Sequence, residues 1–301
     1  MEQSYGQGAD RFGPVSIGFT LALAVLITVA FWIAQHPHAK YVLLHRAPGA
    51  AAVRTALAWV YEKSAGKRGP AARRLSAHMV ASLALLVGWI VVSALAAGFT
   101  AVLEDVLEGD GIAAVDQPAL RWLATHRDLW LTRTLRVVTM AGNPAMLAAL
   151  TVMVCVVATW WRRSWLPAVI GLVGAGGIGL IVITAKALVW RNRPPSPYAV
   201  IAANGYSFPS GHATGTAAVA LLCAWMLTRW VITAWAGKVA VWAAAIGVIG
   251  VVGFSRVYLG VHWISDVLAG WLLGAAWAGA VMLVGSWWDD TSRTRTATAD
   301  M

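Results

Sequence analysis

The sequence predicts an all-α fold, a polytopic membrane bundle of about six or seven transmembrane helices. Of its 301 residues, 59% are hydrophobic and only 12% are charged, whereas a soluble domain usually carries about 25% charged residues. The mean hydropathy is +0.67. The apolar residues gather in runs of about 20, the length that a helix needs to cross roughly 30 Å of hydrocarbon. Seven candidate spans result, at 15–34, 79–103, 144–161, 165–189, 212–230, 236–254 and 262–288.

The segments between the spans divide the chain into four parts. Residues 1–78 hold the first span and a basic loop, within which 41–61 is expected to form an amphipathic helix at the interface. Residues 79–143 hold the second span and an interfacial segment of short helices. Residues 144–288 form the helical core that carries the motifs described below, and 289–301 is a polar tail expected to be disordered.

The distribution of charge predicts the orientation in the membrane. The loop 35–78 carries eight Lys or Arg residues against the single acid Glu62, so the positive-inside rule places it in the cytoplasm. With seven spans, the N-terminus then lies outside the cytoplasmic membrane. The formal net charge is +10, but the basic residues lie mostly in short gaps between apolar runs. No nucleic-acid partner is therefore expected, because such binding needs a basic patch on a soluble face.

Two small residue types inside the spans are expected to serve packing. Cys155 and Cys223 both lie in apolar runs, which predicts core packing rather than a disulfide framework or a metal cluster. Small residues let membrane helices approach closely. We expect this role for the glycines of the fourth span, Gly171, Gly174, Gly176, Gly177 and Gly179.

Three segments break the apolar pattern, and the seven-span count brings all three to the extracytoplasmic side. They run from Lys186 to Pro194, from Phe208 to His212 and from Ser255 to Asp266. Unpaired cations near lipid cost about 2.5–3.5 kcal/mol each, a cost that a bound polyanion relieves. Arginine offers a planar fork that matches phosphate, and a helix start offers free N–H groups. We therefore expect a phosphate site, formed by Lys186, Arg193, Ser210, Gly211 and Arg256.

Two histidines and an aspartate give this site a chemistry beyond binding. Asp266 follows His262 by four residues, so the two face the same way on a helix. The carboxylate holds one ring nitrogen as N–H and leaves the other free to attack, as in nucleophile–base–orienter triads. His212, from a different helix, is then free to act as the acid.

The pattern Lys-x6-Arg-Pro, Pro-Ser-Gly-His and Ser-Arg-x5-His-x3-Asp resembles the type 2 phosphatidic acid phosphatase (PAP2) superfamily. Eleven positions match it in order: Lys186, Arg193, Pro194, Pro209, Ser210, Gly211, His212, Ser255, Arg256, His262 and Asp266. The resemblance implies a PAP2-type helical catalytic core and a metal-independent phosphatase without a cofactor. By the same resemblance, His262 forms a phosphohistidine aligned by Asp266, and His212 protonates the leaving group and activates water. Lys186, Arg193, Ser210, Gly211 and Arg256 hold the phosphate.

Two polar residues near these motifs are not part of the pattern. Arg191 precedes Arg193 by two residues and is expected to be an interfacial anchor. Asp116 lies in the segment after the second span and is expected to be an exposed turn carboxylate, with assistance to catalysis as the alternative.

The sequence favours a lipid phosphatase of the cytoplasmic membrane with its active site facing outward. The expected partners are membrane lipids and a lipid phosphate or diphosphate substrate. A polyprenyl diphosphate (undecaprenyl or decaprenyl) is favoured, because recycling a carrier lipid from the outer leaflet fits the predicted side. Phosphatidylglycerophosphate, phosphatidic acid and diacylglycerol pyrophosphate remain open, as does the oligomeric state. Two other classes are a lipid transporter or scramblase that retains the pocket, and a vanadate-dependent haloperoxidase, which the seven spans disfavour.

Overall fold

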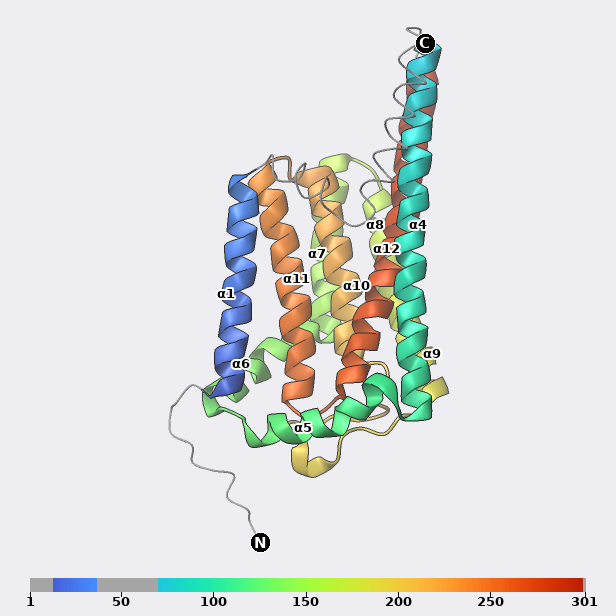
Figure 1. Ribbon diagram of the computed structural model, residues 1–301. Helices are drawn as coiled ribbons and strands as arrows, with labels where there is room; N and C mark the ends of the chain where they lie inside the picture. The colour runs from blue at the N-terminus through green and yellow to red at the C-terminus, as the bar shows by residue number, and fades with distance from the viewer. Residues whose placement is uncertain (1–12, 37–69, 300–301) are drawn as a thin grey trace.

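The computed structural model describes residues 13–36 and 70–299, with side chains for 13–36 and 82–291, and the regular secondary structure in this part of the chain is all helical (Figure 1). The helices that build the bundle are α1 (Pro14–Gln35), α4 (Pro70–Glu108), α7 (Pro144–Arg162), α8 (Leu166–Gly171), α9 (Gly177–Val189), α10 (Gly211–Met226), α11 (Trp235–Tyr258) and α12 (Ile264–Ala299). The π-helical segments η3 (Leu172–Gly176) and η5 (Leu227–Val231) join α8 to α9 and extend α10. The amphipathic helix expected at 41–61 lies outside the described residues.

Seven of these helical stretches are long and apolar enough to cross a membrane, which confirms the predicted bundle. Their bounds differ from the predicted spans by a few residues. The largest difference is in the second span, which runs over Ser82–Glu108, and the seventh begins at Ile264, two residues later than predicted. His262 therefore lies in the short connection before the seventh span.

Short helices lie across one end of the bundle (Figure 1). They are η1 (Gly111–Val115), α5 (Asp116–Thr125), α6 (Leu129–Val138) and η2 (Thr139–Gly142). The expectation of short helices between the second and third spans is met. Tyr258 ties this layer to the bundle, because its hydroxyl accepts from the Asp128 N–H at 2.7 Å.

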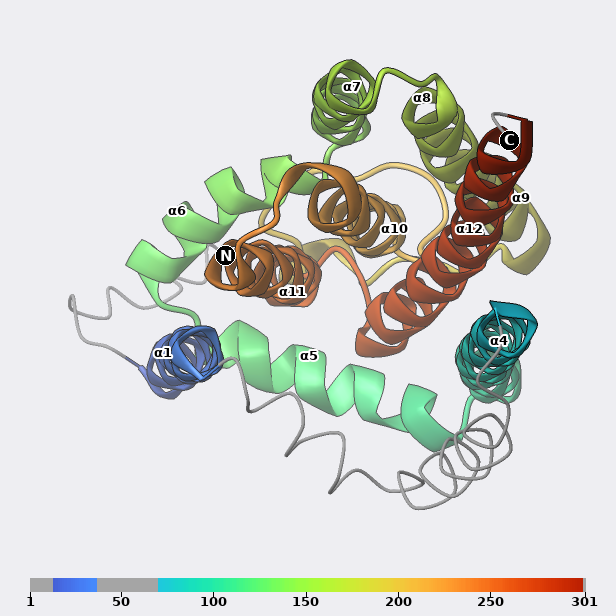
Figure 2. The same cartoon turned by 90° about the horizontal axis from the view of Figure 1, so that it is seen from above.

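Helix α10 lies at the centre of the bundle, surrounded by α7, α9, α11 and α12 (Figure 2). Its sequence is rich in Ala, Gly and Thr, and most of its residues are buried. Helix α1 and the part of α4 from Ser82 to Glu108 instead expose large apolar side chains, as expected of helices that face lipid. The most buried helix thus begins at the Pro-Ser-Gly-His motif.

Glycines allow α12 to pack directly on the backbone of α10. A Cβ at Gly274 would lie 2.4 Å from the Thr214 carbonyl oxygen, and one at Gly270 would lie 2.8 Å from Thr214 Oγ1. The two glycines are four residues apart, the small-xxx-small spacing of close membrane helix pairs. This contact sets the distance between the N-terminal ends of the two helices.

The packing role expected for the fourth-span glycines is confirmed at three positions and wrong at two. A Cβ at Gly171, Gly174 or Gly177 would lie 2.2–2.3 Å from Cys155, Leu222 or Trp277, respectively. Gly176 and Gly179 instead face open space. Cys155 and Cys223 are free and buried, as expected.

The expectation of a disordered tail from residue 289 is wrong, because α12 continues as a helix to Ala299. Asp289 is fully buried and forms ion pairs with Arg162 and Arg229. The Trp230 indole also donates to this carboxylate, at 3.3 Å. These contacts join α12 to the ends of α7 and η5 at the end of the bundle away from α5.

Candidate active site

The three motifs meet at the end of the bundle that α5 and α6 cross. Lys186 lies in the last turn of α9, and the loop that follows carries Arg191 and Arg193. Ser210 is the N-cap of α10, and Arg256 lies in the last turn of α11. Helix α12 begins with Asp266 in its first turn. The structure therefore brings together all eight predicted site residues: Lys186, Arg193, Ser210, Gly211, His212, Arg256, His262 and Asp266.

A tight turn after α11 places His262 at this site. Gly260 has a φ of 72°, and a Cβ there would lie 2.0 Å from the Tyr198 carbonyl oxygen. Only glycine fits this conformation and this close approach without strain. The N–H groups of Val261 and His262 both donate back to the Arg256 carbonyl, at 3.2 and 3.3 Å. The turn thus carries the chain from Arg256 to His262 within one short connection.

The hydrogen bonds of His262 define its tautomer. Nδ1 lies 3.2 Å from Asp266 Oδ2, and Nε2 lies 3.1 Å from Arg193 Nη1. A carboxylate can only accept and a guanidinium can only donate, so the proton resides on Nδ1 and the lone pair on Nε2. His262 is 2% exposed. Burial, only partly offset by Asp266, lowers its pKa to about 4. The imidazole is therefore neutral at pH 7, with a nucleophilic lone pair on Nε2.

Arg256 presents donors that the protein does not satisfy. Its side chain is 5% exposed, and its Nη1 donates to Thr139 Oγ1 of η2 at 3.0 Å. Its Nε is buried without a hydrogen-bond partner among the described residues. A buried donor without an acceptor costs about 1–3 kcal/mol. An anion bound next to this guanidinium would accept a hydrogen bond from its unpaired Nε–H.

Lys186 and Arg193 are held in place by backbone carbonyls. Lys186 Nζ donates to the carbonyl oxygens of Tyr206 at 2.5 Å and Ser207 at 3.3 Å. Arg193 donates to the carbonyls of Gly205 at 2.8 Å, Asn204 at 3.0 Å and Val261 at 2.8 Å.

None of the three cations of the site (Lys186, Arg193 and Arg256) forms an ion pair with a carboxylate in the described part of the chain. Burial lowers the pKa of Arg193, an effect that the nearby Asp266 opposes. A guanidinium nevertheless stays protonated at neutral pH. The site therefore gathers three positive charges, and none of the three is neutralised by a directly paired carboxylate among the described residues.

The start of α10 contributes backbone groups and the second histidine. Ser210 is fully buried, and its N–H donates to the Asp266 carbonyl at 3.0 Å, which links the starts of α10 and α12. The N–H groups of Gly211 and His212 have no acceptor within the helix. A Cβ at Gly211 would make only ordinary contact, 3.5 Å from Val182 and 3.9 Å from Lys186 Cε. Packing alone therefore does not require a glycine at this position.

The His212 ring is half-buried and makes no hydrogen bond to any residue that the structure describes. Its charged and titratable neighbours are Arg256, His262, Arg193 and Lys186. The ring faces η2, because a Cβ at Gly142 would lie 3.0 Å from its Cδ2. An imidazole that keeps both nitrogens available, next to a second imidazole and three cations, can exchange a proton with a bound anion.

The structure corrects two expectations about residues outside the motif pattern. Asp116 is not an exposed turn carboxylate: it is 2% exposed and forms an ion pair with Arg191 at 2.7 Å. Arg191 is more than an interfacial anchor, because it also forms an ion pair with Asp266 Oδ1 at 2.7 Å. The sequence signal for Arg191 was its position two residues before Arg193. For Asp116, which is 75 residues from its partner, the sequence carried no signal.

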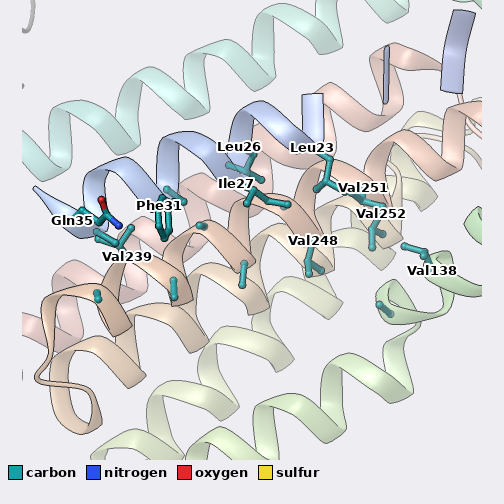
Figure 3. Close-up of a pocket in the computed structure, with 18 residues that line it drawn as sticks. Leu23, Leu26, Ile27, Phe31, Gln35, Val138, Val239, Val248, Val251 and Val252 are labelled. Atoms are coloured by element: carbon teal, nitrogen blue, oxygen red, sulfur yellow. The ribbon is translucent and has the colours of Figure 1, made fainter. Parts of the chain in front are cut away.

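An apolar groove lies beside the site, with a volume of about 790 Å³ (Figure 3). Its walls come from α1 and α11, and Val138, Val251 and Val252 lie at the end nearest the site. Val252 precedes Arg256 by one helical turn on α11. A Cβ at Gly142 would touch both Val252, at 2.6 Å, and His212, at 3.0 Å. Gly142 of η2 thus lies next to both the end of the groove and the site.

Taken together, the residues can bind a phosphate group and attack it with a neutral imidazole. In the described residues, no cluster of three or more His, Cys, Asp or Glu side chains is arranged to hold a metal ion.

Comparisons with known proteins agree with this geometry. Residues 166–290 match the family model of the PAP2 superfamily. Phosphatidylglycerophosphatase B of Bacillus subtilis is 30% identical over 178 residues, which cover 58% of this chain and 86% of that protein. Decaprenylphosphoryl-5-phosphoribose phosphatase of Mycobacterium tuberculosis is 36% identical over 129 residues, 41% of this chain and 63% of that protein.

A solved structure has the same fold. The crystal structure of a transmembrane PAP2-type phosphatidylglycerolphosphate phosphatase from Bacillus subtilis superimposes with a TM-score of 0.57 at 26% identity. The match covers 65% of this chain and 96% of that one. Family model, relatives and fold agree: the chain belongs to the PAP2 superfamily and is a multi-pass membrane phosphatase.

Proposed function

We propose that the protein hydrolyses the terminal phosphate of a lipid phosphate or diphosphate through a phosphohistidine on His262. The observation that carries the proposal is the position of His262 between Asp266 and Arg193. This arrangement leaves a neutral Nε2 lone pair within a group of cations that lack carboxylate partners.

In the first step, the Nε2 lone pair of His262 attacks phosphorus, and the bond between phosphorus and the leaving oxygen breaks. His212, protonated, gives its proton to that oxygen, so the lipid alcohol or lipid phosphate leaves in its protonated form. Asp266 keeps the Nδ1 proton in place and stabilises the imidazolium that forms. A general acid of this kind contributes about 10²–10⁴-fold to the rate.

In the second step, water attacks the phosphohistidine. His212, now neutral, takes a proton from the water as its oxygen bonds to phosphorus. The P–N bond breaks, and its electron pair returns to Nε2 of His262. Inorganic phosphate leaves, and His212 is again protonated for the next cycle.

The cations hold the phosphoryl oxygens during both steps. The Nε of Arg256 and the N–H groups of Gly211 and His212 supply donors that no residue in the described part of the chain uses. Arg193 and Lys186 supply charge at fixed positions. Donors fixed in advance where charge develops are worth about 10²–10³ in rate each.

The groove between α1 and α11 is proposed to hold the hydrocarbon chain of the substrate. It runs along two membrane-spanning helices and is lined almost entirely by apolar side chains. Its end at Val252 lies one helical turn from Arg256 on α11, so a chain in the groove lies close to the cations. A water-soluble phosphate has no hydrocarbon chain that could fill such an apolar groove.

Among lipids, a polyprenyl diphosphate remains the favoured substrate, and phosphatidylglycerophosphate is the second candidate. The name of the Mycobacterium tuberculosis relative describes a polyprenyl-linked phosphate, which supports the first. The names of the Bacillus subtilis relative and of the solved Bacillus subtilis structure describe phosphatidylglycerophosphate, which supports the second.

The active site is proposed to face the extracytoplasmic side of the cytoplasmic membrane. Helix α1 ends and α4 begins at the end of the bundle away from the site (Figure 1), and the basic loop connects these two helices in the sequence. Eight basic residues between positions 35 and 78 favour a cytoplasmic location for it.

The decisive experiment measures phosphate release by the purified full-length protein in detergent with excess chelator. The panel contains a polyprenyl diphosphate, phosphatidylglycerophosphate and phosphatidic acid, and His262→Ala and His212→Ala run beside the wild type. We expect chelator-resistant release that both variants lose. A labelled phosphoenzyme should form in wild type and should be missing in His262→Ala.

Release that survives His262→Ala would refute the phosphohistidine. Faster cleavage of the glycerophospholipids would refute the polyprenyl preference. Transfer of lipid between leaflets that persists in His262→Ala, without hydrolysis in wild type, would favour the transporter alternative.

A bulky residue in the groove tests the chain site. Ala244→Trp fills the groove from α11, and Ala148→Trp is the matched control in a separate apolar groove of about 590 Å³ that borders α7. Ala244→Trp should lower kcat/KM for the long-chain lipid about tenfold or more by misplacing its phosphate. A short soluble phosphate ester should be cleaved at the wild-type rate. Equal effects of both variants on both substrates would refute the chain site.

A further inference from the structure

A second polar layer lies behind the site, and its contacts go to Asp266 rather than to the space for the phosphate. Its members are Asp116 at the start of α5, Arg191 in the loop after α9, and Ser265 in the first turn of α12. On the strength of the proposed function, we propose that Asp116 and Arg191 are positioning residues that fix Asp266, and through it the attacking imidazole of His262.

Both oxygens of Asp116 are engaged. Oδ1 accepts from the Ser265 N–H at 3.0 Å, and Oδ2 accepts from the Ser265 hydroxyl at 2.5 Å. The Ser265 N–H lies in the first turn of α12, where no acceptor is available within the helix. Asp116 thus caps α12 from another helix, which fixes the start of α12 against α5.

Arg191 connects this cap to Asp266 with its planar fork. Nη2 donates to Asp116 Oδ2 at 2.7 Å. Nη1 donates to Asp266 Oδ1 at 2.7 Å and to Ser265 Oγ at 2.7 Å. The guanidinium also lies 5.6 Å from the centre of the Trp263 ring. Lysine cannot replace this fork, because its ammonium does not present two coplanar donors in fixed positions.

The result is that the Asp266 carboxylate is held at both oxygens. Oδ1 receives Arg191, and Oδ2 receives the Trp263 N–H at 3.0 Å and His262 Nδ1 at 3.2 Å. Asp266 is fully buried. A carboxylate held at both oxygens cannot rotate away from the imidazole, so the direction of the His262 lone pair is fixed before substrate binds.

The layer also controls charge near the nucleophile. Arg191 adds a positive charge next to Asp266, and Asp116 adds a negative charge next to Arg191. The other charged or titratable groups around His262 are Asp266, Arg193, Arg256 and His212. Removing Arg191 takes away a cation and favours the imidazolium, whereas removing the charge of Asp116 disfavours it.

Asp116 lies outside residues 166–290, which match the family model. The short helices after the second span therefore contribute to the catalytic arrangement and are more than a surface layer. This is a role that neither the motif pattern nor the sequence of the core predicts.

The test uses Asp116→Asn, Arg191→Gln and Arg191→Lys in the full-length protein. We expect kcat to fall about 10–100-fold in each variant, because a small misplacement of a reacting group has effects of this size. KM should change less than threefold, because neither side chain contacts the phosphate. Formation of the labelled phosphoenzyme should slow by the same factor as kcat.

The pH profile separates a positioning role from a structural one. The acid limb of kcat/KM should move up by about one pH unit in Arg191→Gln and down in Asp116→Asn. Arg191→Lys keeps the positive charge but loses the planar guanidinium. The acid limb of its kcat/KM profile should therefore stay at the wild-type pH while kcat falls. The double variant Asp116→Asn/Arg191→Gln should lose no more kcat than the worse single variant, as expected of one coupled unit.

Matched controls come from the C-terminal end of α4 and from α6, at the same end of the bundle. Asp105→Asn removes a carboxylate that accepts the Ile112 N–H at 2.8 Å, and Arg136→Gln removes a guanidinium that donates to the Val200 carbonyl at 2.7 Å. Both should keep wild-type kcat and the wild-type acid limb.

The proposal fails if Asp116→Asn and Arg191→Gln match their controls, or if they lose thermal stability and raise KM with an unmoved acid limb. The proposed function fails separately, if wild type releases no phosphate or if His262→Ala retains activity.

Discussion

The contact between α10 and α12 makes Gly274→Ala a sharp test of the active-site geometry. The added methyl would lie 2.4 Å from the Thr214 carbonyl oxygen, whereas ordinary contacts begin at 3.4 Å. The obstacle is backbone, so α12 must move away from α10 by about 1 Å. Overpacking of this kind costs about 1–3 kcal/mol. Thr214 follows His212 by two residues, and Asp266 precedes Gly274 by about two helical turns.

This displacement separates the helix that carries His212 from the one that carries Asp266. A misplacement of about 1 Å can cost about 10²-fold in rate. We therefore expect kcat to fall about 100-fold in Gly274→Ala, with a lower thermal unfolding temperature in detergent. The assay is phosphate release from the preferred lipid, together with thermal unfolding of the same sample.

The matched control is Gly179→Ala on α9, where an added methyl meets nothing within 4 Å. It should be neutral or slightly more stable, because alanine favours a helix over glycine by up to about 1 kcal/mol. Wild-type kcat and stability in Gly274→Ala would refute the claim that this close contact sets the distance between the two catalytic helices.

Three further outcomes follow from the site and from the far end of the bundle. Because burial holds the pKa of His262 at about 4 rather than 6.5, the reactive neutral form persists at mildly acidic pH. On the acid side, we expect kcat/KM to fall as the pH drops through about 4, and an acid limb near 6.5 in the pH–rate profile would contradict this. Arg256→Lys should lower kcat about 10²-fold, because it removes the planar guanidinium and its unused donor. Single-turnover kinetics measure this effect, and an unchanged rate of the chemical step would argue against that role. Asp289→Asn leaves Arg162 and Arg229 without their shared carboxylate and should cost about 3 kcal/mol, measured by thermal unfolding; an unchanged unfolding temperature would show that the pairs add nothing.

The bundle was predictable from the sequence because membrane spans depend on local composition. Each of the seven spans is a continuous apolar run, so length alone identified it. The motif residues were predictable for a similar reason, since each motif is short and its residues recur at fixed spacing. His262 and Asp266, one helical turn apart, are such a pair.

Contacts between distant segments were not predictable in this way. Asp116 looked like any polar residue after a span, and only the fold brings it to Arg191. Asp289 looked like the start of a polar tail, but its partners lie on α7 and η5. The spacing of Gly270 and Gly274 did carry a signal, although the glycine-rich fourth span was the more obvious place to look. A helix contact requires a partner surface, which one segment alone does not define.

Helix α12 is tied at both ends. Asp116 holds its first turn, and Asp289 joins its far part to Arg162 and Arg229. Sliding this helix along its axis would break the hydrogen bonds to Asp116 at one end and the ion pairs of Asp289 at the other end at the same time. We therefore expect α12 to keep its position during turnover, and we expect the movements that admit substrate and release product to occur in the helices around it.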